Sequence, residues 1–214
     1  ALSDGEQALL LSGTNVALRH LRHLGAAPAR ALDGNSRNNG LLVKDVDGFI
    51  IEDVECGSVG KAGNGTRLGF AGAGALFDNA RNGVVRDLRV IDSKADAAHV
   101  TAGSANIDVF GFFALRPGDD GFAVVDYADD TRHCEHIRVF GGHVYDALAR
   151  GWSVVGGRNI RYIAPFASGT TAAAFYFAQE SGFYHTKGVS DVHIINGYAR
   201  NCVTGAGQDP NFSN

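Results

Sequence analysis

The sequence predicts an all-β fold, a parallel β-helix (a solenoid) of about seven coils. Three observations lead to this prediction: a strand pattern that recurs every 23 to 34 residues, a second strand pattern in nearly the same rhythm, and repeats too short to contain a crossover helix. The apolar content of 45% is sufficient for a packed core. We expect residues 1–214 to form a single β-helix domain, either a fragment or an assembling unit of a longer β-helix.

The first pattern is a small polar or turn residue followed by alternating apolar and polar residues. Such a two-residue period is typical of strands, because successive side chains point to opposite faces. An asparagine opens four copies, where we expect a turn residue in the left-handed conformation. The copies occupy residues 15–18, 48–51, 82–85, 106–109, 136–139, 159–162 and 191–194, at spacings of 33, 34, 24, 30, 23 and 32.

The second pattern recurs between copies of the first. It occupies residues 96–100, 120–124, 150–154 and 173–177, at offsets of 24, 30 and 23. Two strand columns that rise by the same step describe a coil, whose turns stack at about 4.8 Å. A β-propeller or a β-sandwich is the alternative, but both need hairpins, and no Asn-Gly or Asp-Gly stands in a two-residue loop between alternating strands.

The two ends of such a coil would expose backbone donors and acceptors. Residues 1–11 could form a short cap or part of a coil, whereas residues 205–214 contain no apolar cap. We therefore expect either further coils of a longer chain or end-to-end self-association.

Composition narrows the classes of partner. The net charge of −4 argues against non-specific nucleic-acid binding, which needs a basic surface. No apolar run is long enough to span a membrane, and no signal peptide is visible. We expect a secreted protein or one at a cell or virion surface.

Three acids lie at the starts of adjacent copies of the second pattern: Asp96 opens one copy, Asp120 opens the next, and Asp119 directly precedes Asp120. Adjacent coils would bring the three carboxyl groups onto one surface, where like-charge repulsion should raise one pKa. Strict alternation would send Asp119 and Asp120 to opposite faces, so both reach the surface only if the strand begins after them. Glycoside hydrolysis needs one protonated and one ionised carboxyl, which this group could supply.

The run Pro-Gly-Asp-Asp-Gly-Phe-Ala-Val at residues 117–124 resembles the pectin-lyase-like superfamily of right-handed parallel β-helices, and is most similar to the polygalacturonase-like glycoside hydrolases. The resemblance implies right-handed winding and matches Asp96, Asp119 and Asp120 to the three acids of that family. Two departures accompany it. Arg150 stands where the family has the histidine of Gly-His-Gly, and residues 176–178 replace the Arg-Ile-Lys that holds a sugar carboxylate. We therefore do not expect this chain to hydrolyse polygalacturonate.

Four further side chains are expected beside the acids. The column order places His99, Arg150 and Tyr176 on the same surface, and Glu180 follows in a long turn. Carboxylate and aromatic groups together suit the hydroxyls and faces of sugars, so these residues are candidates for binding a polysaccharide or oligosaccharide. The alternative is that Arg150 simply forms an ion pair with Asp120.

We therefore expect a carbohydrate-active protein that cleaves or binds a polysaccharide, as a hydrolase or else as a lyase or epimerase. The alternative is a non-catalytic structural or adhesive segment of a surface, phage-tail or assembly protein. No cofactor is expected and no metal is assigned to the acids. The acidic turn with Asp126, Asp129 and Asp130 could hold calcium, although a solvated loop is the preferred interpretation.

Overall fold

The structure is a computed structural model that describes residues 8–32, 38–182 and 184–204. The expected features of the two ends fall mostly on residues 1–7 and 205–214, which lie outside the described residues. Residues 9–11 are the start of the first strand.

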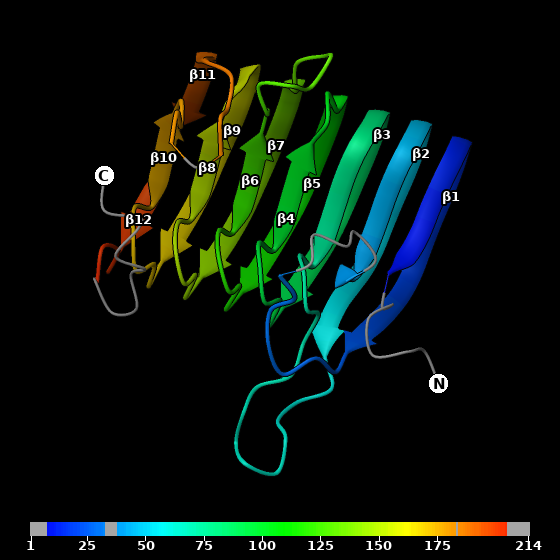
Figure 1. The fold of residues 1–214 in the computed structure, drawn as a ribbon, viewed down its shortest axis with the longest axis vertical. Coiled ribbons are helices and arrows are strands. Elements are labelled where there is room, and N and C mark those ends of the chain that lie inside the picture. The colour runs from blue at the N-terminus through cyan, green and yellow to red at the C-terminus, as the bar shows by residue number, and fades with distance from the viewer. Residues whose placement is uncertain (1–7, 33–37, 183, 205–214) are drawn as a thin grey trace.

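All named strands pair in parallel, and Figure 1 shows the chain advancing across the view from the blue β1 to the red-brown β11. The strands are β1 (Leu9–Gly25), β2 (Leu41–Ser58), β3 (Ala75–Ile91), β4 (Ala98–Thr101), β5 (Ala105–Leu115), β6 (Phe122–Val125), β7 (Glu135–Tyr145), β8 (Trp152–Val155), β9 (Gly157–Ser168), β10 (Phe175–Ala178), β11 (Val189–Ile195) and β12 (Tyr198–Arg200). No helix within the described parts of the chain is long and apolar enough to cross a membrane.

The fold class differs from the predicted solenoid of about seven coils, and that prediction is wrong. The strands form one all-parallel sheet, whose nine-strand path β10-β8-β6-β4-β3-β5-β7-β9-β11 bends round into a nearly closed, barrel-like sheet. The reason is β3, which pairs with β4 through Ala75–Asp78 and with β5 through Arg81–Ile91. The two strand columns expected to be separate are therefore joined in one sheet by a strand of 17 residues.

The pairing of the repeats agrees with their spacing in the sequence. Ile107 of β5 pairs with Ile137 of β7, and Ile137 pairs with Ile160 of β9. The four asparagines that open repeats have φ between 55° and 57°, in the left-handed region as expected. They are Asn15, Asn82, Asn106 and Asn159. A residue that tolerates this conformation lets the strand bend without interrupting the parallel pairing on either side.

Large side chains fill the interior behind the short strands. Phe122 and Trp152 are fully buried, and their rings stack with centroids 5.9 Å apart. The indole of Trp152 donates a hydrogen bond of 3.0 Å to the carbonyl of Phe166, which satisfies its buried polar group. Burial of each such side chain contributes about 1.5–3 kcal/mol to stability, so this core holds β6 and β8 firmly in register.

Candidate active site

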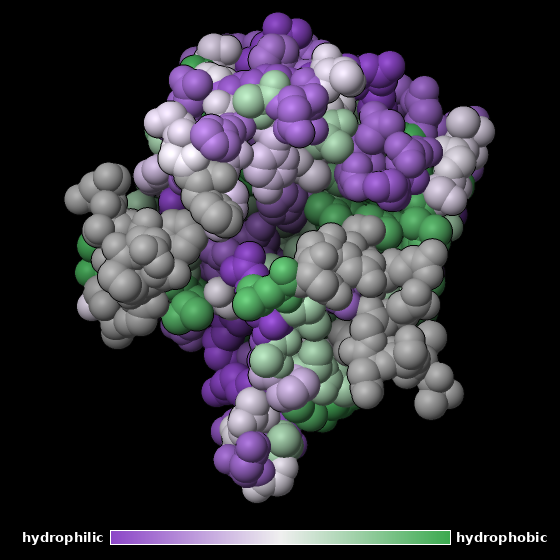
Figure 2. Space-filling view, viewed as in Figure 1, coloured by the Kyte–Doolittle hydropathy of each residue, from purple (hydrophilic) through white to green (hydrophobic). Residues whose placement is uncertain are grey.

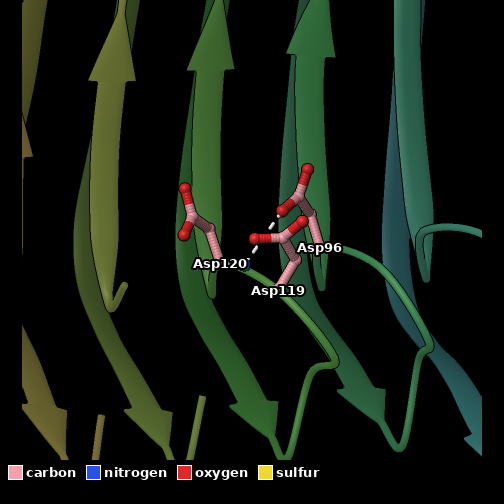
Figure 3. Close-up of side chains that lie close together, drawn as sticks. All are labelled: Asp96, Asp119 and Asp120. Atoms are coloured by element: carbon pink, nitrogen blue, oxygen red, sulfur yellow. Dashed lines mark hydrogen bonds between the residues drawn. The ribbon is translucent and has the colours of Figure 1, made fainter. Parts of the chain in front are cut away.

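The three acids lie where two turns stack just before β4 and β6. Asp119 and Asp120 precede the first residue of β6, Phe122. The alternation of side chains along a strand therefore does not send them to opposite faces, which is the condition for both to reach the same surface. The backbone N–H of Ala97 donates to the carbonyl of Asp120 at 2.9 Å, which places the turn of Asp96 against the turn of the pair. One carboxylate oxygen from each acid lies within 4.8 Å of the others, and Figure 3 shows the three side chains gathered at this point.

Asp120 is the most buried member of this acid cluster. Its Oδ1 accepts a hydrogen bond of 2.9 Å from the backbone N–H of Arg150, and its Oδ2 accepts one of 2.6 Å from the Ser153 hydroxyl. Burial, together with the charges of Asp119 and Asp96, raises the pKa of Asp120 from 3.8 to about 7. Arg150 and Ser153 act in the opposite direction and do not offset the burial. This carboxyl can therefore hold a proton near neutral pH.

Asp119 forms an ion pair with an arginine that is far from it in the sequence. Its Oδ2 accepts a hydrogen bond of 2.8 Å from Nη1 of Arg30, which lies in the segment between β1 and β2. Burial and the charge of Asp96 raise the pKa of Asp119, although Arg30 and Arg150 act to lower it. The charge of Asp119 in turn raises the pKa of Asp120, so an ionised Asp119 favours a protonated Asp120.

Asp96 forms a dyad with His99. Its Oδ1 accepts the backbone N–H of Asp120 at 2.9 Å, and its Oδ2 lies 2.6 Å from Nδ1 of His99. Burial by itself would lower the pKa of His99, but the hydrogen bond to Asp96 and the charges of Asp119 and Asp120 prevail and raise it. A protonated His99 can donate to Asp96 and so fixes the direction in which that carboxylate points.

The remaining expected binding residues come together around Arg150. Its Nη2 donates to Oε1 of Glu180 at 2.9 Å, and its Nη1 lies 3.6 Å from Oδ2 of Asp120. The guanidinium also lies over the ring of Tyr176, 3.9 Å from its centroid. The simple pair of Arg150 with Asp120 is therefore present, but the shorter contact is the one to Glu180.

A cavity of about 410 Å³ opens over the acid cluster and is lined by all three aspartates, His99, Arg150 and Glu180. Figure 2 shows polar side chains gathered around the hollow in the middle of this face. Tyr176 is not part of the lining and acts on the cavity through Arg150.

Sequence reasoning missed several residues of the site. Arg30 gave no signal, because it lies outside every repeat and 89 residues before its partner Asp119. Tyr127 also lines the cavity and was missed, because it follows β6 outside both strand patterns. Tyr184 lines the cavity as well, in the long turn after β10 that carries Glu180, where a wall of the groove was expected. Ser153 was not missed: the alternation of the second strand pattern places it outward beside the acids, in register with Ala123 and Tyr176. It does contact Asp120, but it is fully buried and not exposed to solvent.

Three carboxylates at this spacing could also hold a metal ion. In this structure, however, protein groups already balance their charge, because Arg30 contacts Asp119 and the imidazole of His99 contacts Asp96. Arg150 lies beside Asp120 in the same way.

The acidic turn that could hold calcium has a different set of contacts. Asp126 is fully buried, and its carboxylate contacts Nζ of Lys187 at 2.9 Å and Nδ1 of His133 at 2.8 Å. Lys187 also donates to the carbonyls of Asp130 and Arg132. A lysine ammonium thus occupies a cation position at Asp126, and it ties the segment that carries Glu180 to this turn.

Comparison with protein-family models, with curated proteins and with solved structures gives no match. The function has to be inferred from the geometry and the electrostatics of the cavity.

Proposed function

We propose that this chain cleaves glycosidic bonds in a polysaccharide, with Asp96, Asp119 and Asp120 as the reacting acids. The observation that carries the proposal is the close approach of three carboxylates at the wall of a cavity, where the pKa of Asp120 is raised to about 7. Such a site can offer a protonated and an ionised carboxyl at the same pH, which is the requirement of glycoside hydrolysis. The resemblance of residues 117–124 to polygalacturonase-like hydrolases of the pectin-lyase-like superfamily supports the same chemistry.

In the proposed reaction, the Asp119–Asp120 pair donates its proton to the glycosidic oxygen as the bond to the anomeric carbon breaks. Asp96 accepts a proton from the water whose oxygen adds to that carbon, so that atoms and charges balance. Ser153 suits both states of Asp120, because a hydroxyl can donate to the ionised carboxylate and accept from the protonated acid.

The groups around the acids would position the sugar. Arg150 is held by Glu180 and by the ring of Tyr176, so its guanidinium has little freedom and needs little ordering on binding. His99 orients Asp96 through their hydrogen bond. We assign sugar binding to Arg150, Glu180 and His99, and we assign Tyr176 to holding Arg150 in place.

A polysaccharide digestion panel tests the proposal. Asp120→Asn should lower the cleavage rate by about 10²–10⁴, the usual contribution of general acid–base catalysis. Asp108→Asn is the matched control, because Asp108 pairs with Arg138 on the exposed surface of β5 and does not line the cavity. A loss of less than about tenfold in Asp120→Asn would remove Asp120 from catalysis.

A second candidate is the non-catalytic assembly module, with end-to-end self-association. Among the described residues, β1 pairs only with β2, and β11 pairs only with β9. These edge strands carry exposed apolar side chains, with Leu10 56% exposed on β1 and Ile195 42% exposed on β11. Light scattering over a concentration series tests it: growing oligomers whose assembly is unaffected by Asp120→Asn support an assembly module, and a concentration-independent monomer contradicts it.

A further inference from the structure

A second cavity, of about 660 Å³, lies next to the acid cluster and uses part of the same wall. Arg30, Asp119 and Arg150 line both cavities. The second cavity extends from them past Lys94 and Arg67. A polymer that places one sugar at the acids could therefore extend its neighbouring unit into this second cavity.

Basic side chains outnumber acidic ones in the lining of the second cavity. Its lining contains five basic side chains and three acids. Arg116 is matched by Asp92, which accepts two hydrogen bonds of 2.7 and 3.1 Å from it. Arg30 is matched by Asp119. For Lys94 and Arg67, no carboxylate within the described ranges lies at ion-pair distance.

Lys94 and Arg67 are also held near one another. The ammonium of Lys94 donates a hydrogen bond of 2.7 Å to the backbone carbonyl of Arg67, which joins the turn before β4 to the loop between β2 and β3. Burial lowers the pKa of Lys94, and the charge of Arg67 lowers it further, against the opposing charge of Asp92. Two cations on one cavity wall favour an anion that would balance them.

We propose that Lys94 and Arg67 form a binding site for an anionic group, a carboxylate or a sulfate, carried by the polysaccharide next to the bond that is cleaved. The identity of the polymer rests on the proposed function, whereas the anion site rests on the second cavity and on two cations in its wall that form no ion pair with any carboxylate of the described residues. The ammonium of Lys94 and the guanidinium of Arg67 both donate charge-assisted hydrogen bonds. An arginine can bind a carboxylate or a sulfate through two such bonds.

The first experiment titrates the protein with inorganic sulfate and follows the side-chain resonances of Lys94 and Arg67 by NMR. Wild type should show saturable binding, weakened at least about tenfold by Lys94→Gln and by Arg67→Gln, the usual scale for loss of one charge-assisted hydrogen bond. Lys61→Gln is the matched control, because Lys61 lies in the same loop but lines neither cavity. Absence of sulfate binding in wild type, or equal binding by all four proteins, would overturn the anion site.

The second experiment uses hexasaccharides of alginate, carrageenan and cellulose, which carry carboxylates, sulfates and no charge. Isothermal titration should show one of the charged oligomers bound at least about tenfold more weakly by Lys94→Gln, and cellohexaose bound alike by variant and wild type. A neutral glycan bound and cleaved equally by both proteins, without sulfate binding, would overturn the anion site and leave the cleavage proposal standing. Sulfate binding at Lys94 without cleavage of any glycan in the digestion panel would overturn the cleavage proposal and leave the anion site standing.

Discussion

The protonation of Asp120 should be measurable as a pH dependence of folding stability. Burial among other carboxylates raises the pKa of Asp120 from 3.8 to about 7 in the folded chain. Between about pH 4 and pH 7 the folded state therefore holds a proton that the unfolded state has released. The free energy of unfolding should fall as the pH rises through this window, by about 1.4 kcal/mol per pH unit and about 4 kcal/mol in all.

The assay is urea denaturation of wild type and Asp120→Asn between pH 3.5 and pH 8.5. The difference in unfolding free energy between the two proteins should shift in favour of the variant by about 4 kcal/mol between pH 4 and pH 7, and should be flat outside that window. Asp129→Asn, an exposed acid in the turn after β6, is the control and should keep the wild-type shape because Asp120 is still present. A difference that is constant with pH, or that favours wild type as the pH rises, would show that Asp120 is an ionised partner of Arg150 and would refute the reasoning.

Three further changes probe the same site. Arg150→Ala leaves the partly buried Glu180 without its 2.9 Å partner and removes the cation next to Asp120, so denaturation should show a loss of about 3–5 kcal/mol. Ser153→Ala removes a hydrogen bond that lowers the pKa of Asp120, so the carboxyl titration followed by ¹³C NMR should move above that of wild type. Gly118→Ala would place a Cβ 2.5 Å from a backbone carbonyl oxygen of the neighbouring turn, so thermal unfolding should report a loss of about 1–3 kcal/mol, and an unchanged melting temperature would contradict this packing.

The strand pairing could be predicted from the sequence, because parallel pairing of repeats depends on local patterns of apolar and turn residues. Alternating apolar residues at 106–109, 136–139 and 159–162 specify strands of one register, and the residues that open these ranges, Asn106, His136 and Asn159, adopt the left-handed conformation at the bends. The fold class was not accessible in the same way. Whether two strand columns remain apart or merge depends on how far a strand continues through its bend, and β3 continues for 17 residues across both.

The sequence by itself determined that Asp96, Asp119 and Asp120 would meet, since residues one repeat apart become neighbours once parallel strands pair in register. It also placed His99 and Arg150 beside them. Only the tertiary structure decided how these charges are matched: Arg30 reaches Asp119 from a segment outside every repeat, and Ser153 is buried beneath Asp120. The physical reason is that desolvation and ion pairing act through space, so the pKa of Asp120 depends on groups whose distance along the chain carries no information about their distance in the fold.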